Sequence, residues 1–156
     1  CKPLLESAES INLDQATLIH GGGWKKMIDK DIDSKKFKNI INKVTGVKQV
    51  YDYYGMVEQA GSIYLECKNG YLHTSIYSDV IMRKSDFSIC DINESGIIQV
   101  ISLLPTSYPG NSILTEDSGV LLGEDDCSCG RKGKYFSIIG RIQSAETRGC
   151  SDTFSE

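Results

Sequence analysis

The length, composition and charge of the chain exclude several classes of function. Its 156 residues are 40% hydrophobic and 24% charged, a balance typical of a globular domain, and the net charge of −4 gives no general attraction to nucleic acid phosphates. The longest apolar runs fall short of the ~20 residues that cross a bilayer, so neither nucleic acid nor a membrane span is expected.

The predicted elements begin with a strand, a helix and a second strand. The apolar run Ala16–His20 ends at three glycines, which predicts a buried strand followed by a tight turn. Apolar residues then recur at helical spacing from Ser34 to Val44, with Gly46 just beyond, which predicts a helix. Gln49–Tyr54 is typical of a strand. A strand, a helix and a strand in this order predict a parallel βαβ edge.

Short strands dominate the rest of the chain. The candidates are Ser62–Cys67, Tyr71–Ser75, Val80–Arg83, Gly96–Leu103, Ser112–Thr115, Val120–Leu122 and Tyr135–Gly140. We therefore expect a mixed α/β (α+β) fold, in which the βαβ edge leads into a mainly antiparallel sheet or distorted barrel.

The first residue and the cysteines indicate the context of the chain. It begins with Cys1, without a signal segment, so we expect it to be part of a longer protein. Six cysteines would suit a secreted disulfide scaffold, but such scaffolds are usually short and loop-rich. A cytoplasmic location, with thiols used for metal binding or chemistry, is the expectation.

Several polar groups occur at the ends of predicted strands. Tyr54 and Gly55 place a ring beside a glycine that lets backbone approach a ligand, and Glu58 adds a carboxylate that could hold Mg²⁺. Asp117 could accept the hydroxyls of a ribose, and Arg141 could neutralise a phosphate. Each of these residues is also typical of ordinary structure when taken alone.

Taken in order, these segments resemble the adenylate-forming superfamily, which includes acyl-CoA synthetases, firefly-type luciferases and phenylacetate–CoA ligases. The shared order is Gly-Gly-Gly, Tyr-Gly-x-x-Glu, an aspartate after an apolar strand, and Gly-Arg. The resemblance implies ATP and Mg²⁺ as cofactors. It assigns adenine to Gly21, Gly22, Gly23, Tyr54 and Gly55, magnesium to Glu58, the ribose to Asp117, and a place beside the nucleotide to Arg141.

Residues 123–152 resemble one branch more closely, the acyl-protein synthetases, which are the fatty-acid-activating subunits of the bacterial bioluminescence fatty acid reductase complex. The resemblance implies an acid–thiol ligase that forms acyl-AMP, transfers the acyl group to an enzyme cysteine as a thioester, and passes it to a reductase subunit. It gives the cysteine's role to Cys150, whose thiolate the nearby Arg148 would favour. It also implies that residues 1–149 are the C-terminal part of an adenylation domain and that 150–156 are a mobile tail.

The chain departs from the superfamily pattern in two ways. Val57 stands where the superfamily usually has threonine, which removes a hydroxyl that could contact AMP. The superfamily's phosphate-gripping loop and its later domain with a catalytic lysine have no counterpart in these residues. We expect this stretch of chain alone to be inactive.

Two pairs of soft ligands predict a structural zinc site. Cys67 and His73 form one pair and Cys127 and Cys129 the other, and zinc favours tetrahedral Cys and His sets. The four positions resemble a set found in the phenylacetate–CoA ligase branch. The competing interpretation is a group of buried cysteines and a hydrogen-bonded histidine.

Two alternative functions remain open on the sequence. An aryl–CoA ligase related to phenylacetate activation would use coenzyme A as the acyl acceptor. A non-catalytic, zinc-stabilised binding module would keep Glu58, Asp117 and Arg141 only as relics.

Overall fold

The computed structural model describes residues 12–21 and 34–142 of the chain. These residues fall into two units, which divide between Tyr51 and Asp52. The first unit contains the described residues up to 51, and the second contains 52–142.

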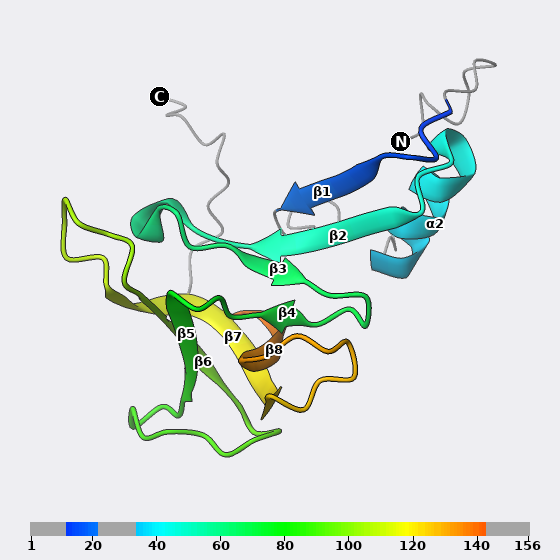
Figure 1. The fold of residues 1–156 in the computed structure, drawn as a ribbon. Coiled ribbons are helices and arrows are strands. Elements are labelled where there is room, and N and C mark those ends of the chain that lie inside the picture. The colour runs from blue at the N-terminus through cyan, green and yellow to red at the C-terminus, as the bar shows by residue number, and fades with distance from the viewer. Residues whose placement is uncertain (1–11, 22–33, 143–156) are drawn as a thin grey trace, which may run out of the picture. The chain divides into compact units, whose positions relative to one another are not determined.

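The described residues of the first unit form a strand, a helix and the beginning of a second strand. Strand β1 is Thr17–Gly21, helix α2 is Ser34–Thr45 and strand β2 is Gln49–Tyr54. β1 and β2 are neighbours in the sheet and their arrows point the same way (Figure 1), so the predicted βαβ edge is present. The prediction of a buried strand was wrong, because Ile19 of β1 is 53% exposed. The apolar face of α2 presents Phe37, whose ring lies edge-on to His20 at 4.9 Å.

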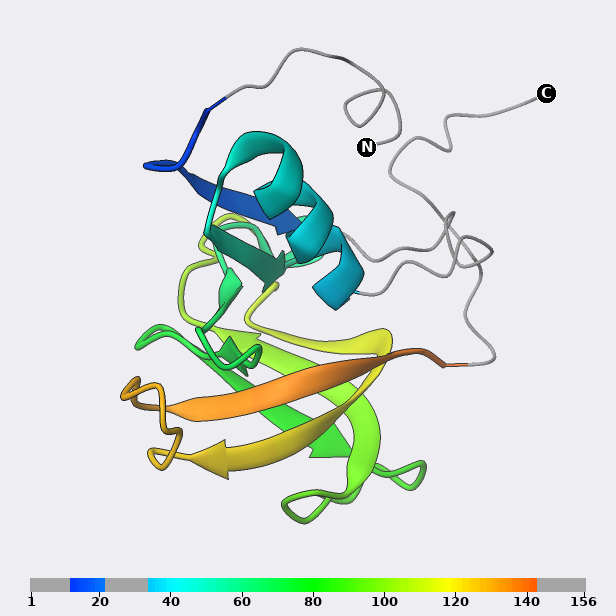
Figure 2. The same ribbon diagram turned by 90° about the vertical axis from the view of Figure 1, so that its right-hand side faces the viewer.

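The second unit is an open sheet whose neighbouring strands run antiparallel. After β2 the strands are β3 (Tyr64–Glu66), β4 (Leu72–His73), β5 (Ser78–Arg83), β6 (Ser95–Ser102), β7 (Ser112–Glu124) and β8 (Lys134–Arg141). Their order across the sheet is β2-β3-β4-β8-β7-β6-β5, and Figure 2 shows the long strands β6, β7 and β8 lying side by side. The predicted mixed fold with a mainly antiparallel sheet is confirmed.

Buried residues of the second unit form one hydrophobic core. Its buried members are Tyr64, Leu72, Val80, Met82, Cys90, Ile98, Val100 and Phe136. The Tyr64 hydroxyl donates to the Asp79 carbonyl at 3.2 Å, and Ser62 Oγ donates to Ser102 Oγ at 2.6 Å. These bonds join β3 and its approach to β5 and β6, strands from the opposite part of the sheet order, so the sheet curls around its core.

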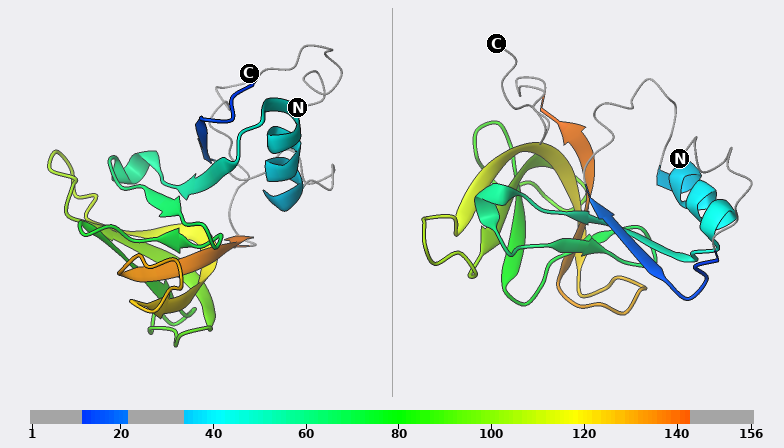
Figure 3. Two further views of the ribbon diagram at one scale, coloured as in Figure 1. Left: turned by 45° about the vertical axis from the view of Figure 1, so that its right-hand side comes forward. Right: turned by 90° about the horizontal axis from the view of Figure 1, so that it is seen from above.

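Strand β7 corrects one expectation. Ser112–Thr115 and Val120–Leu122 were predicted as separate strands, but both belong to the single strand Ser112–Glu124, which bends along its length (Figure 3). The pairing with β8 shifts register between Ser118 and Gly119, and a Cβ on Gly119 would lie 2.7 Å from the Ser137 carbonyl. The glycine is therefore required for the close approach of β8, and it does not end the strand.

Helices long and apolar enough to cross a membrane are absent from the described ranges.

Candidate metal centre and nucleotide site

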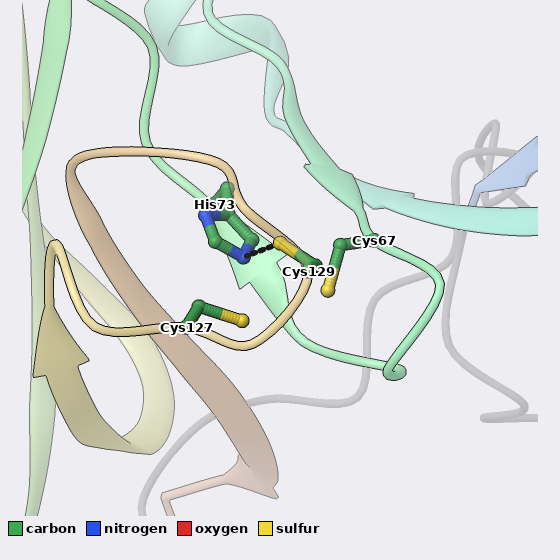
Figure 4. Close-up of side chains that lie close together, drawn as sticks. All are labelled: Cys67, His73, Cys127 and Cys129. Carbon is green, nitrogen blue, oxygen red and sulfur yellow. Dashed lines mark hydrogen bonds between the residues drawn. The ribbon is translucent and has the colours of Figure 1, made fainter.

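Three cysteines and a histidine meet at one place in the second unit. Cys67 follows β3, His73 belongs to β4, and Cys127 and Cys129 lie in the loop between β7 and β8. Their ligand atoms all lie within 4.8 Å of one another, and Figure 4 shows the four side chains converging on a common centre. The structure therefore brings together all four residues predicted as zinc ligands.

Two turns of the same design present the three sulfurs. The first turn, Cys67–Gly70, is closed by a hydrogen bond from the Gly70 amide to the Cys67 carbonyl at 2.9 Å. The second turn, Cys127–Gly130, is closed in the same way at 3.0 Å. Both glycines have positive φ, 83° and 90°, a conformation that glycine adopts without strain. The repeated Cys-x-x-Gly pattern is visible in the sequence and is the signal for these turns that the sequence analysis missed.

The cluster is largely shielded from water. Cys67, His73 and Cys127 are buried and Cys129 is half-buried. His73 Nε2 lies 3.5 Å from Cys129 Sγ, and burial together with the charge of Arg131 lowers the pKa of His73. The imidazole is thereby kept neutral, the form that binds a metal.

Hydrogen bonds favour the thiolate form of Cys127. Burial alone would raise the pKa of Cys127, but hydrogen bonds from Cys129 and Asn69 outweigh it and lower the pKa. Three sulfurs and one imidazole nitrogen within reach of one point form a donor set that suits tetrahedral Zn²⁺. The residues present therefore fit the metal that the sequence predicted.

Tyr135 is a neighbour of the cluster that the sequence analysis did not single out. Its ring stacks on the imidazole of His73, with centroids 5.5 Å apart and planes at 20°. The two residues are paired in register across β4 and β8. An aromatic residue three positions after Gly-Arg-Lys gave no signal of its own, because the contact depends on strand pairing.

A second group of polar residues lies at the other end of the pairing between β7 and β8. Asp117 and Arg141 are directly paired across the two strands, and Arg141 Nε lies 3.8 Å from Asp117 Oδ1. The Tyr54 hydroxyl at the end of β2 donates to Asp117 Oδ2 at 2.8 Å. The structure thus brings together three residues predicted to bind the nucleotide, from three different strands.

Asp117 is fixed by hydrogen bonds to both its side chain and its backbone amide. Burial, and then the neighbouring Asp117 carboxylate, raise the pKa of Tyr54 well above its usual range, so the phenol stays protonated and keeps donating its hydrogen bond. Thr115 Oγ1 donates to the Ile98 carbonyl at 2.8 Å and accepts the Asp117 amide at 3.1 Å. Thr115 is a further contributor that the sequence analysis did not identify.

The remaining predicted site residues are not part of the group formed by Tyr54, Asp117 and Arg141. Glu58 lies exposed in a short 3₁₀ helix, Val57–Gln59, and its carboxylate makes no hydrogen bond or ion pair with the other described residues. Gly55 lies between this helix and Tyr54, and Gly21 ends β1 in the first unit. Gly22, Gly23 and Cys150 lie outside the described residues.

The Asp117 carboxylate lies between the Tyr54 phenol and the Arg141 guanidinium and stays partly accessible. Asp117 and Arg141 have side chains 20% and 27% exposed, so a ligand can reach them without unfolding the sheet. A hydroxyl-bearing ligand that reached Asp117 would compete with or share the hydrogen bond that Tyr54 now makes. The arrangement is suited to binding, and by itself it contains no nucleophile.

Comparison with known proteins places the chain in a family. A family model described as "Acyl-protein synthetase, LuxE" matches residues 4–156. The long-chain-fatty-acid–luciferin-component ligase of Vibrio harveyi is 24% identical over 144 residues, which are 89% of this chain and 36% of that relative.

Solved structures of ligases share the fold. A long-chain-fatty-acid–CoA ligase (FadD1) from Archaeoglobus fulgidus superposes with a TM-score of 0.59 at 10% identity, over 91% of this chain and 32% of its own. The O-succinylbenzoate coenzyme A synthetase (MenE) of Bacillus subtilis, in complex with ATP and magnesium, gives 0.60 at 16% identity, over 92% and 30%. The chain spans about a third of the length of these relatives. Since the family model covers nearly the whole chain, the protein belongs to the acyl-protein synthetase (LuxE) family.

Proposed function

We propose that this chain supplies part of the nucleotide site of an enzyme that activates a fatty acid with ATP. The observation that supports the proposal is the position of Asp117, which β7 and β8 hold between the Tyr54 hydroxyl and the Arg141 guanidinium. In this proposal Asp117 binds the ribose hydroxyls and Arg141 lies beside the nucleotide. As the family resemblance implies, adenine would bind at Gly21–Gly23, Tyr54 and Gly55, and Glu58 would bind Mg²⁺.

The proposed reaction has two steps. The fatty acid carboxylate attacks the α-phosphorus of ATP, so acyl-AMP forms and pyrophosphate leaves. The Cys150 thiolate then attacks the acyl carbon, and a C–S bond forms as the bond to AMP breaks. Residues 150–156 would carry the thioester to a reductase subunit in the cytoplasm, and residues 1–149 would belong to the adenylation domain.

Exchange of labelled pyrophosphate into ATP by the full-length protein tests the first step. We expect exchange that depends on a fatty acid. The panel of acids should include phenylacetate, because exchange with aryl acids, followed by acyl transfer to coenzyme A, would favour the aryl–CoA ligase. No exchange with any acid, together with no heat of AMP binding in calorimetry, would favour the non-catalytic module.

Labelling with a radioactive fatty acid and ATP tests the second step. We expect a hydroxylamine-labile acyl-enzyme in the wild type and none in Cys150→Ser, since a serine ester resists mild hydroxylamine. Cys90→Ser is the matched control, because Cys90 is buried in the core of the second unit. A labile acyl-enzyme that persists in Cys150→Ser would remove Cys150 from the mechanism.

We also propose that Cys67, His73, Cys127 and Cys129 bind a structural Zn²⁺. When bound, the metal would cross-link the β3–β4 and β7–β8 loops. Metal analysis of the purified protein should find about one zinc per chain. Less than about a tenth of an equivalent would contradict this site.

A further inference from the structure

The two metal-binding turns are joined by side chains that are not themselves ligands. The first turn is Cys67–Gly70 and the second is Cys127–Gly130, as defined above. We propose that Asn69 and Arg131 are positioning residues, which hold the two turns at the separation that a tetrahedral metal requires. This inference rests on the proposed zinc site and adds to it the residues that set its affinity.

Asn69 reaches from the first turn to the second. Its Nδ2 donates to Ser128 Oγ at 2.8 Å and also lies 3.8 Å from Cys127 Sγ, within hydrogen-bonding range for sulfur. The bond to Ser128 uses no atom that a metal would need. It therefore links the turns whether or not the metal is bound.

Arg131 directly follows the second turn and links it to strands β3 and β4. Its backbone amide donates to Cys129 Sγ at 3.3 Å, and its Nη1 donates to the Leu65 carbonyl at 2.9 Å. Leu65 of β3 is paired in register with His73 of β4. Arg131 thus ties the cysteine loop to the strand pair that carries the histidine ligand.

These links act on metal affinity in two ways. A site that is already assembled loses less conformational freedom when the metal binds. Three thiolates around one dication leave a net negative charge, which N–H donors to sulfur and a nearby guanidinium stabilise. Partners outside the ligand set typically change metal affinity 10–100-fold when removed.

Asn69 lies in the first turn and Arg131 directly follows the second, and both are exposed, so their removal should leave the fold intact. The neighbouring Lys68 is exposed and makes no hydrogen bond or ion pair with another described residue, which makes Lys68→Ala the matched control. Arg131→Lys keeps the positive charge and loses the planar guanidinium, so it separates the charge from the link to Leu65. Ser128→Ala removes the acceptor for Asn69 while leaving the Asn69 contact with Cys127.

The test is competition for Zn²⁺ between the full-length protein and a chromogenic chelator. Asn69→Ala and Arg131→Ala should each weaken zinc binding by about tenfold or more, Ser128→Ala by less, and Lys68→Ala by less than about threefold. The cobalt-substituted variants should keep the intense visible absorption of a tetrahedral thiolate site, which shows that the ligands themselves are unchanged.

Two failures are distinguishable. A wild type that binds neither zinc nor cobalt would overturn the metal site itself. A wild type that binds zinc, with Asn69→Ala and Arg131→Ala binding as tightly as Lys68→Ala, would overturn the positioning role and leave the metal site standing.

Discussion

The two ends of the β7–β8 hairpin differ in what they hold. At the closed end, Glu124 pairs with Lys134 and the connecting loop carries Cys127 and Cys129. At the open end, Asp117 pairs with Arg141. The closed end gathers mostly buried sulfur, whereas the open end presents half-exposed charge.

The two ends of the hairpin are therefore suited to different proposed roles, metal binding at the closed end and ligand binding at the open end. A buried thiolate cluster suits a metal that stays in place, since solvent and competing ligands are kept away. In the proposed nucleotide site a ribose would enter and leave, so the Asp117 carboxylate would have to remain within reach of water. Both ends belong to the same two paired strands. The middle of this hairpin is packed and includes Phe136, which is fully buried.

The largest expected effect is the loss of metal at the closed end. Cys127→Ser replaces a buried thiolate with a hydroxyl, a much poorer zinc ligand, so bound zinc should fall from about one per chain to below about a tenth. The midpoint of thermal unfolding should fall by more than about 4 °C. Cys90→Ser should keep its zinc, and equal zinc contents in the two variants would break the distinction between cluster and core cysteines.

A smaller effect is expected at the open end. Asp117→Asn removes the charge that would hold the ribose hydroxyls, so the affinity for AMP should fall roughly 10–100-fold, or about 1.5–3 kcal/mol. Calorimetry measures the affinity, and zinc content should not change. Glu116→Gln is the control, because it also removes a carboxylate beside Arg141, at 3.4 Å, but one whose side chain is 60% exposed. An AMP affinity that is the same in both variants would contradict the role of Asp117.

The smallest effect concerns the hydrogen bond that orients the aspartate. Tyr54→Phe keeps the ring and removes the hydroxyl that donates to Asp117, so AMP affinity should fall about fivefold, which corresponds to roughly 1 kcal/mol. Tyr53→Phe, on the exposed neighbouring residue of β2, should bind AMP as the wild type does. A larger loss in Tyr53→Phe than in Tyr54→Phe would show that the wrong tyrosine has been assigned.

Much of the fold could be predicted because its signals are local. The helical spacing from Ser34 to Val44 and the alternation in β5 and β6 depend on short-range periodicity. β7 could not be predicted as one strand, since Asp117, Ser118 and Gly119 have the composition of a turn. Only the close packing of β8 against Gly119 shows that the strand continues.

The candidate sites were predictable in their ligands and not in their supports. The candidate metal ligands can be recognised by residue type alone; they are Cys67, His73, Cys127 and Cys129. Thr115, Tyr135 and Asn69 do not, because their contacts arise from strand pairing and from the meeting of two distant turns. The role of such supporting residues depends on their three-dimensional position, which cannot be read from the sequence alone.

The most direct test of the account is the rate of fatty-acid-dependent pyrophosphate exchange by full-length Asp117→Asn. The account predicts a rate at least about tenfold below the wild type at subsaturating ATP, with Glu116→Gln close to the wild type and zinc retained in both. Exchange by Asp117→Asn at the wild-type rate would contradict the placement of the nucleotide at the open end of the hairpin.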